Sequence, residues 1–215
     1  MNIKPETIQA VSWAGKMGKK YTDRNPQSTK ELNELYRKQY GISRVKLNRD
    51  FLGALDRNFK ILEVGANIGL QLETLRKMGF SNLLGVEINE YAVRQAKEIH
   101  PKVDIIRGSA LNLPFREGYF DLVFTSGVLI HISPKDINKA LDEIWRTSSR
   151  YVWGFEYFAP ELSEITYRGK KDLLWKRDFC ALYLQRFPDF KIVKEQKFSL
   201  KGSENQSQMF LLKKV

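Results

Sequence analysis

The sequence predicts an α/β fold built on a mostly parallel sheet, and residues 60–87 carry most of this prediction. Two short apolar runs, at 60–64 and 83–87, each contain a carboxylate near their end, and the segment between them has apolar residues at helical spacing. Short apolar runs bounded by glycine, with a helical period between them, are typical of a βαβ unit. In such units ligands bind beyond the carboxyl ends of the strands. We therefore expect a ligand site near Gly65, Gly69 and Glu87.

The rest of the chain supplies the strands and helices that such a sheet needs. Further strand patterns occur at 103–107, in the segment that begins at Tyr119, and at 151–158, 190–200 and 208–212. The last two patterns alternate and are joined by a polar turn, which predicts a β-hairpin. Helical patterns lie at 91–99, from Ser133 to about Ser148, and from 177 to about 187. We therefore expect a seven-stranded sheet whose last strand is antiparallel.

A helical extension precedes the first strand. Ser28 and Glu31 form a capping box, which predicts a helix that ends at Gly41. A second helical stripe covers 47–55. Residues 1–27 instead hold aromatic side chains spaced by glycines, without a regular period, and this favours a lid or an ordered loop over the site. The alternative is an N-terminal arm that packs its tryptophan on the domain.

Length and composition predict one domain over residues 1–215. A chain of 215 residues with 42% hydrophobic side chains can bury a substantial core. We divide it into an N-terminal lid and helices (1–58), a binding core (59–158), a substrate-side insertion (159–176), and a closing helix and β-hairpin (177–215).

Composition also argues against several classes of protein. No apolar run approaches the ~18 residues of a membrane helix, and the segment 1–6 lacks the apolar core of a signal peptide. One cysteine, Cys180, offers neither an internal disulfide nor a metal cluster, and we expect it to be a buried apolar residue on a helix. We therefore expect a cytoplasmic protein without a membrane partner or a metal site.

The charge distribution indicates an anionic partner. The net charge is +11, with +6 in residues 1–58, −2 in 59–167 and +7 in 168–215. Basic regions on both sides of a near-neutral core favour a small anionic substrate by electrostatic steering. Nucleic acid is the other functional possibility, and a solvated basic surface is the alternative without function. The oligomeric state is not predicted.

Glycine spacing distinguishes between nucleotide ligands. A dinucleotide site needs G-x-G-x-x-G, but Asn67 and Leu70 occupy its second and third glycine positions. The remaining pattern, E-x-G-x-x-x-G followed by an acid at Glu87, resembles the class I S-adenosylmethionine-dependent methyltransferases. The resemblance implies a Rossmann-like class I methyltransferase fold and S-adenosylmethionine as cofactor. For the glycines alone, the alternative is an ordinary βα turn of a parallel sheet.

The resemblance also implies the residues that hold the cofactor. In that family the glycine turn passes close to the cofactor, and the acid that ends the second strand binds both ribose hydroxyls. The turn after the third strand holds the adenine, with aspartate usual where Ser109 stands, and the end of the fourth strand holds the methionine moiety. The expected cofactor-binding residues are Glu63, Gly65, Asn67, Gly69, Glu87, Ile88, Ser109, Ala110, Leu111, Thr125, Ser126 and Gly127.

Three side chains are candidates for the catalytic base. His131 follows the small-residue turn at the end of the fourth strand, and its unperturbed pKa lies near neutral pH. Glu156 ends the fifth strand and Asp23 lies on the expected lid, and both rank behind His131. The alternatives are a structural histidine and carboxylates that are only surface charges.

Basic and aromatic residues alternate in the expected lid and insertion. This combination suits recognition of a phosphate or carboxylate together with stacking on a sugar or base. The residues expected at the substrate are Trp13, Tyr21, Arg24, Asn25, Tyr157, Tyr167, Arg168, Trp175, Lys176 and Arg177.

Four stretches suggest a narrower group. W-A-G…Y-T-D-R-N, S-G-V-L-I-H-I, W-G-F-E-Y and L-L-W-K-R-D-F resemble methylases associated with pseudaminic (nonulosonic) acid biosynthesis. This resemblance implies methyl transfer to an acidic sugar or to its nucleotide-linked form. The rival hypotheses are an RNA methyltransferase, which the charge favours but for which the chain lacks the Asn/Asp-Pro-Pro-Tyr signature, and a non-catalytic protein that binds S-adenosylmethionine.

Overall fold

The computed structural model describes residues 7–215, so the segment 1–6, in which we expect no signal peptide, lies outside the described residues. Within residues 7–215 a seven-stranded sheet has the order β3-β2-β1-β4-β5-β9-β8. Pairing is parallel from β3 to β5, and β9 is antiparallel to both of its neighbours. The fold class predicted from the sequence is thus confirmed. The strands are β1 Lys60–Val64, β2 Asn82–Glu87, β3 Asp104–Arg107, β4 Phe120–Ser126, β5 Ser148–Phe158, β8 Phe190–Ser199 and β9 Gln206–Lys214.

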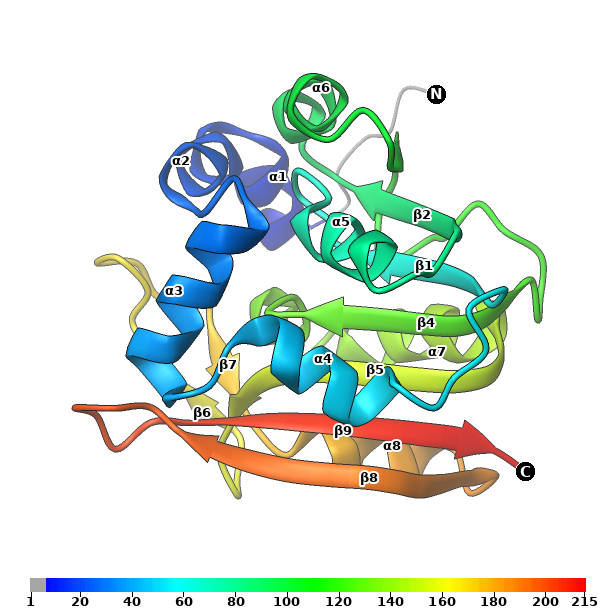
Figure 1. The fold of residues 1–215 in the computed structure, drawn as a ribbon. Helices are drawn as coiled ribbons and strands as arrows, with labels where there is room; N and C mark the ends of the chain where they lie inside the picture. Colours follow the sequence, from blue (N-terminus) through cyan, green and yellow to red (C-terminus); the bar gives the residue numbers. More distant parts are fainter. Residues whose placement is uncertain (1–6) are drawn as a thin grey trace.

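Helices cover both faces of this sheet (Figure 1). Successive strand residues point to opposite faces, so Phe124 packs in one hydrophobic cluster and its neighbour Val123 in the other. The first cluster joins the sheet to α4, α5 and α6, and the second joins it to α7 and α8. These helices are α4 Arg44–Leu52, α5 Leu70–Lys77, α6 Glu90–Ile99, α7 Ile137–Thr147 and α8 Phe179–Arg186.

Three N-terminal helices stand at the end of the sheet to which the arrows of β2 and β4 point (Figure 1). They are α1 Ile8–Ala14, α2 Lys16–Arg24 and α3 Thr29–Tyr40. Helix α3 has the predicted limits, because the Ser28 side chain accepts from the Glu31 amide and Gly41 ends the helix in a left-handed conformation.

The segment before α3 is helical, which corrects the expectation of an irregular lid or loop. Its two helices have seven and nine residues and meet at Gly15, so neither is long enough to show a clear hydrophobic period. No residue of α1 is buried. The segment therefore lies on the domain as a cover and not as part of the core.

Two other details differ from the sequence-based expectation. Helix α7 begins at Ile137 and not next to Ser133, because the Ser133 carbonyl accepts from the amides of Asp136 and Ile137 in a preceding turn. The insertion contains a two-stranded sheet of β6 Ser163–Glu164 and β7 Trp175–Lys176, which the sequence did not indicate. A short 3₁₀ helix, η1 Leu129–His131, follows β4.

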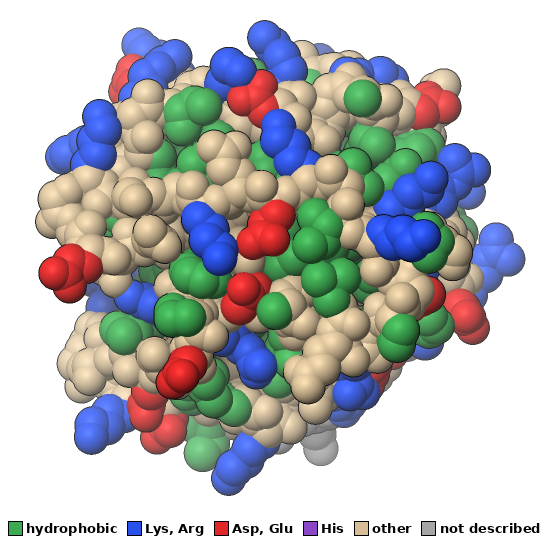
Figure 2. Space-filling model, turned by 90° about the horizontal axis from the view of Figure 1, so that it is seen from below, with side chains coloured by type: hydrophobic (Ala, Val, Ile, Leu, Met, Phe, Trp, Pro, Cys, Tyr) green, Lys and Arg blue, Asp and Glu red, His purple; other side chains and the backbone are tan. Residues whose placement is uncertain are grey.

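The face of the molecule on the β8 and β9 side carries mixed charges. Figure 2 shows Lys and Arg side chains spread over this face, with acidic side chains and hydrophobic patches between them. Cys180 is buried on α8, as predicted. Among residues 7–215, no helix combines the length and the apolar character that crossing a membrane requires.

Candidate active site

A cavity of about 550 Å³ opens at the carboxyl ends of the parallel strands. Its walls come from α2, α3, the turns after β1 and β3, the end of β2, η1, the end of β5 and the insertion. Most of the side chains predicted from the sequence line it: Trp13, Tyr21, Arg24, Asn25, Glu63, Gly65, Asn67, Glu87, Ile88, Ser109, Ala110, Leu111, Ser126, Gly127, His131, Glu156, Tyr157, Tyr167 and Arg168.

The structure does not bring Asp23 into this cavity, which corrects its assignment as a candidate base. Asp23 is exposed on the outer side of α2, and its Oδ1 accepts from the Tyr91 hydroxyl at 2.7 Å. Gly69 and Thr125 also lie outside the lining. Gly69 begins α5 with a φ of 75°, and Thr125 is buried behind the wall.

The end of the insertion also lies away from the cavity, which corrects three predicted substrate contacts. Trp175 is buried on β7, a strand that contacts η1 and β5. The Lys176 ammonium contacts the Asn205 side chain, and Arg177 lies beside Trp175 in a small separate hollow. These residues support η1 from behind instead of facing the cavity.

The glycine turn after β1 leaves little space for side chains. Gly65 has a φ of 76°, and a Cβ atom there would lie 2.5 Å from Cγ2 of Val128. Asn67, at the position where the resembled family has its middle glycine, has a φ of 49°. Asparagine tolerates this left-handed conformation better than most residues do. The departure from the family pattern therefore keeps the backbone conformation of the turn.

The Glu87 carboxylate is fixed at the edge of this turn. Its Oε2 accepts from the Asn67 amide and its Oε1 from the Asn89 amide, both at 2.8 Å. Burial raises the pKa of Glu87, and the backbone N–H groups act in the opposite direction. Because each carboxylate oxygen has two lone pairs, both oxygens can still accept from a ligand in the cavity.

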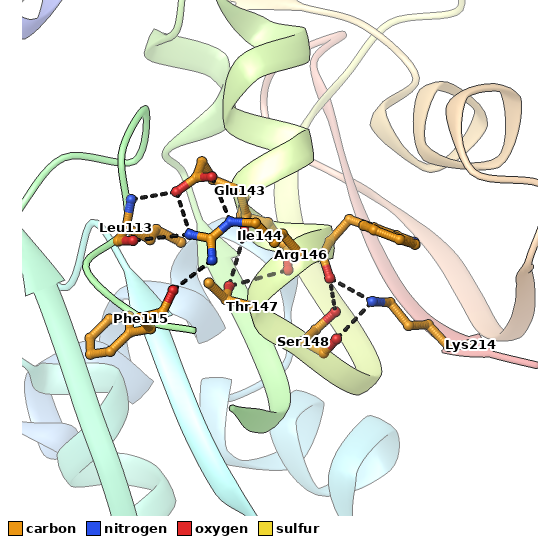
Figure 3. Close-up of polar contacts among 9 residues, drawn as sticks. Leu113, Phe115, Glu143, Ile144, Arg146, Thr147, Ser148 and Lys214 are labelled. Atoms are coloured by element: carbon orange, nitrogen blue, oxygen red, sulfur yellow. Dashed lines mark hydrogen bonds and ion pairs between the residues drawn. The ribbon is translucent and has the colours of Figure 1, made fainter. Parts of the chain in front are cut away.

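Side chains of helix α7 hold the loop after β3 by polar contacts (Figure 3). Glu143 accepts from the Leu113 amide at 2.6 Å, and Arg146 donates to the carbonyls of Phe115 at 2.6 Å and Leu113 at 3.0 Å. Glu143 and Arg146 also form an ion pair at 2.8 Å. The same loop begins with the cavity-lining turn at 109–111, so this ion pair holds the expected adenine turn in place.

His131 has a defined tautomer. Its Nδ1 lies 2.7 Å from the Leu173 carbonyl oxygen, and a carbonyl can only accept, so Nδ1 carries the proton. Burial lowers the pKa of His131 to about 4, although the Leu173 carbonyl opposes this. The ring packs between Trp13 of α1, at 4.3 Å between centroids, and Tyr167 of the insertion, at 5.1 Å. The neutral imidazole thus has a lone pair on Nε2.

Glu156 lies buried at the end of β5 and also lines the cavity. Its Oε1 accepts from the Val128 amide at 3.2 Å, whereas its Oε2 is buried without a partner among the described residues. Burial raises the pKa of Glu156 to about 7, against the opposing hydrogen bonds from Val128, Thr125 and the start of η1. Glu156 therefore both supports the segment that carries His131 and places a titratable oxygen at the cavity.

Sequence reasoning missed Arg44, which is 0% exposed behind the cavity wall. Arg44 donates to the Tyr36 hydroxyl at 2.6 Å, the Asn48 side chain at 2.8 Å and the Ser126 hydroxyl at 3.1 Å. Its Nη2 has no partner among residues 7–215, and the same holds for Oε2 of the nearby Glu63, whose pKa burial raises. One signal was available: Arg44 and Asn48 share the buried stripe of α4 with Leu47 and Phe51.

The N-terminal helices are attached to the cavity mainly through polar contacts. Asn89 donates to the Trp13 carbonyl at 2.8 Å, and Arg24 donates to the Tyr167 hydroxyl at 2.7 Å. The Thr22 hydroxyl lies 3.1 Å from the Asn67 side-chain oxygen. These contacts connect the cover to the turns around Glu87 and to the insertion.

Comparison with known proteins finds a family match for residues 62–150 and relatives that resemble part of the chain. Residues 62–150 match the family described as "Methyltransferase domain". The chain is 29% identical over 111 residues to 24-methylenesterol C-methyltransferase 2 of Arabidopsis thaliana, covering 47% of this chain and 30% of that protein. It is 28% identical over 100 residues to an uncharacterized protein of Haemophilus influenzae, covering 44% and 40%. The chain thus spans less than half the length of these relatives.

Solved structures share the fold over a longer range. Geranyl diphosphate C-methyltransferase from Streptomyces coelicolor has a TM-score of 0.73 at 12% identity, covering 99% of this chain and 100% of that chain. The [4+2]-cyclase SpnF has a TM-score of 0.63 at 14% identity, covering 79% of each chain. These structures show which fold the chain shares, and residues 62–150 carry the match to the methyltransferase domain family. Because one neighbour is named a cyclase, the fold alone does not fix the chemistry.

Proposed function

We propose that this chain is an S-adenosylmethionine-dependent methyltransferase that acts on a small anionic acceptor, such as an acidic sugar or a nucleotide-linked sugar. The methyl group is transferred to an oxygen or nitrogen of the acceptor. One observation carries the proposal: inside a matched methyltransferase domain, Glu87 is fixed by two backbone amides at the edge of a glycine turn that lines a cavity.

The residues present fit the cofactor. The cavity of about 550 Å³ lies within the ~300–1,000 Å³ typical of small-molecule sites. Gly65 and Asn67 line the cavity with their backbone turn, and a side chain at Gly65 is excluded because its Cβ would lie 2.5 Å from Val128. Glu87 would hold the ribose, the turn at 109–111 the adenine, and Glu63 with the turn at 126–127 the methionine end. The unpartnered Oε2 of Glu63 is a buried acceptor suited to an ammonium group.

When bound, S-adenosylmethionine supplies an electrophilic methyl group on a sulfonium, so the protein's own tasks are alignment and exclusion of water. The cover formed by α1 and α2 excludes water, and well-oriented groups can gain roughly 7–11 kcal/mol from alignment alone. A hydroxyl acceptor also needs a base to take its proton. His131 offers the Nε2 lone pair, and Glu156 offers an oxygen without a partner.

A pH–rate profile separates these two bases. If His131 takes the proton, turnover rises only near pH 4 and is flat above it, because the neutral ring is the active form. If Glu156 takes the proton, turnover rises through about pH 7, because ionisation creates the base. We favour His131 because its hydrogen bond to Leu173 already fixes the required tautomer.

The anionic character of the acceptor is supported by the side chains at the cavity. Arg24 and Arg168 both line it and are both exposed, so they can meet a carboxylate or phosphate at the entrance. The Streptomyces neighbour of similar fold is described in complex with geranyl diphosphate, which is compatible with an anionic acceptor in this fold. The aromatic faces of Trp13 and Tyr167 provide stacking surfaces for a sugar or base.

Two measurements test the proposal. Calorimetry should show that the wild-type chain binds S-adenosylhomocysteine. The affinity should fall at least tenfold in Glu87→Ala and stay unchanged in the exposed control Glu98→Gln. Incubation with labelled S-adenosylmethionine and a panel of acidic sugars, nucleotide sugars, sterols and RNA should label an acidic sugar or nucleotide sugar. Absence of cofactor binding, or labelling of RNA alone, would contradict the proposal.

A further inference from the structure

Tyrosine hydroxyls are concentrated in the part of the cavity next to α2, α3, β5 and the insertion. Among residues 7–215, the tyrosines that line the cavity are Tyr21, Tyr36, Tyr40, Tyr157 and Tyr167. We call these five residues the tyrosine chamber. Three come from α2 and α3, one from β5 and one from the insertion, so folding brings three separate regions of the chain together.

Two arginines determine how two of these phenols are oriented. Arg44 donates to the Tyr36 hydroxyl at 2.6 Å, and Arg24 donates to the Tyr167 hydroxyl at 2.7 Å. A guanidinium can only donate, so both phenol oxygens act as acceptors in these bonds. The phenol proton of each tyrosine is therefore left for another acceptor. The Ser126 hydroxyl also accepts from Arg44, so its proton is likewise left for another acceptor.

Burial keeps the phenols of Tyr21 and Tyr157 protonated at neutral pH. Burial raises the pKa of Tyr21, and the phenols of Tyr167, Tyr36 and Tyr157 raise it further. Burial likewise raises the pKa of Tyr157, with Tyr36 and Tyr167 adding to the effect. All five tyrosines line one cavity, and the rings of Tyr36 and Tyr40 lie 5.3 Å apart between centroids, so the chamber presents several O–H donors.

The positive charge of Arg44, which lies behind the chamber, is not neutralised by the groups that accept hydrogen bonds from Arg44. The groups that accept from Arg44 are the neutral side chains of Tyr36, Asn48 and Ser126. Burial raises the pKa of the nearby acid Glu63, whereas the charge of Arg44 lowers it, and no hydrogen bond joins Glu63 to Arg44. Arg24, at the other wall, stacks on the Tyr21 ring at 5.1 Å. Convergent donors with cationic groups behind them suit anionic oxygens, because charge-assisted networks are the stronger ones.

We infer that the tyrosine chamber binds the anionic group of the methyl acceptor, a carboxylate or a phosphate, through phenol O–H groups. Arg44 orients the Tyr36 phenol from behind the wall, and Arg24, at the cavity entrance, orients the Tyr167 phenol. The inference rests on the proposed function, since it assumes that the ligand of the chamber is the acceptor. It differs from direct ion pairing, because Arg44 is fully buried and does not line the cavity. Tyr36 and Tyr167 are then the residues that determine specificity.

Binding of simple probes to the chain saturated with S-adenosylhomocysteine tests this inference. Calorimetry is carried out with glucuronate, glucose 1-phosphate and glucose, which separate a carboxylate, a phosphate and a neutral hydroxyl ligand. We expect at least one anionic probe to bind tenfold or more tightly than glucose. In Tyr167→Phe and Tyr36→Phe this preference should fall at least fivefold, whereas Tyr119→Phe, a half-exposed tyrosine outside the cavity, should leave it unchanged.

The outcomes separate this inference from the proposed function. If S-adenosylhomocysteine does not bind, the proposed function fails. If it binds but glucose binds as well as the anionic probes, or neither anionic probe binds at millimolar concentration, only the chamber assignment is overturned. Tyr167→Phe removes a hydroxyl from an insertion tyrosine that is not fully buried, so its result stands even if Tyr36→Phe does not fold. A retained preference in Tyr167→Phe would also overturn the inference.

Discussion

The side of the cavity that we propose for the cofactor (the cofactor side) is formed by backbone turns at strand ends, whereas the side that we propose for the acceptor (the acceptor side) is formed by side chains from helices and the insertion. On the cofactor side, the Glu87 carboxylate is fixed by the backbone amides of Asn89, in the turn after β2, and Asn67, in the turn after β1. On the acceptor side, His131 lies between Trp13 and Tyr167, two residues far from it in the sequence. The arrangement of the backbone turns is determined by the order of the strands in the sheet. The arrangement of the side chains around His131 instead requires that α1 and the insertion are packed against it.

This difference has an energetic counterpart. The strands beneath the cofactor side carry fully buried residues such as Leu62 and Val64, each stabilising the fold by about 1.5–3 kcal/mol. Helix α1 buries no residue. We therefore expect the cover to open at a low free-energy cost, below that of global unfolding, and to admit ligands while the strand ends keep their arrangement.

The largest effect should come from the acceptor side. We expect His131→Ala to lower turnover by about 10²–10⁴-fold, as is usual for loss of a general base. S-adenosylhomocysteine affinity, measured by calorimetry, should stay within about twofold, because His131 is not among the cofactor-side residues. Asn in place of His131 can still donate to the Leu173 carbonyl, so His131→Asn should fold normally and remain inactive. An equal loss of turnover and of affinity would mean that His131 is structural.

On the cofactor side, Gly65→Ala should be the most damaging change. A Cβ there lies 2.5 Å from Val128 and meets a φ of 76°, so we expect a loss of about 2–4 kcal/mol of unfolding free energy. Gly202→Ala is the matched control, with a φ of 73° and no atom within 4 Å of the added Cβ. It should cost about 1 kcal/mol. Urea unfolding measures both, and equal losses would show that the Val128 contact is unimportant.

Glu156 should make stability depend on pH in a specific direction. Its pKa is raised to about 7, so the folded chain keeps a proton that the unfolded chain loses near pH 4.5. Stability from this group is therefore present below pH 4.5 and is lost as pH rises through about 7, by up to about 3 kcal/mol. Glu156→Gln cannot ionise, so its unfolding free energy should fall less than that of the wild type between pH 5 and 8. Parallel curves would contradict the assignment.

The smallest effect should come from the brace behind the adenine turn. Glu143→Gln weakens the ion pair with Arg146 that fixes Leu113, and we expect S-adenosylhomocysteine affinity to fall about fivefold, equivalent to about 1 kcal/mol. Asp142→Asn, on the same helix as Glu143, is the control, since it removes an ion pair to Arg186 of α8 without touching the loop. Equal affinities in both variants would show that the loop holds its shape alone.

The turns at the strand ends could be predicted from the sequence, because they depend on local signals. Glycines, strand-end acids and apolar runs lie within 60–87, and the structure brings Gly65, Asn67 and Glu87 to one cavity. The left-handed conformation at Asn67 could not be derived, although asparagine tolerates it better than most residues other than glycine.

The acceptor side could be predicted only in part. Trp13, Tyr21, Arg24 and Tyr167 reach the cavity, but Asp23, Trp175, Lys176 and Arg177 do not. Adjacent residues in these segments face opposite directions, and which one faces the cavity depends on packing that no local pattern encodes. Arg44 was missed for the same reason, because its partners Tyr36 and Ser126 come from other elements.

A crystal structure of the chain with S-adenosylhomocysteine tests the central claim most directly. We expect the nucleoside to lie along the turn at 65–69, with both ribose hydroxyls within hydrogen-bond distance of the Glu87 carboxylate. A nucleoside bound elsewhere, or a Glu87 side chain turned away from the ribose, would contradict the account.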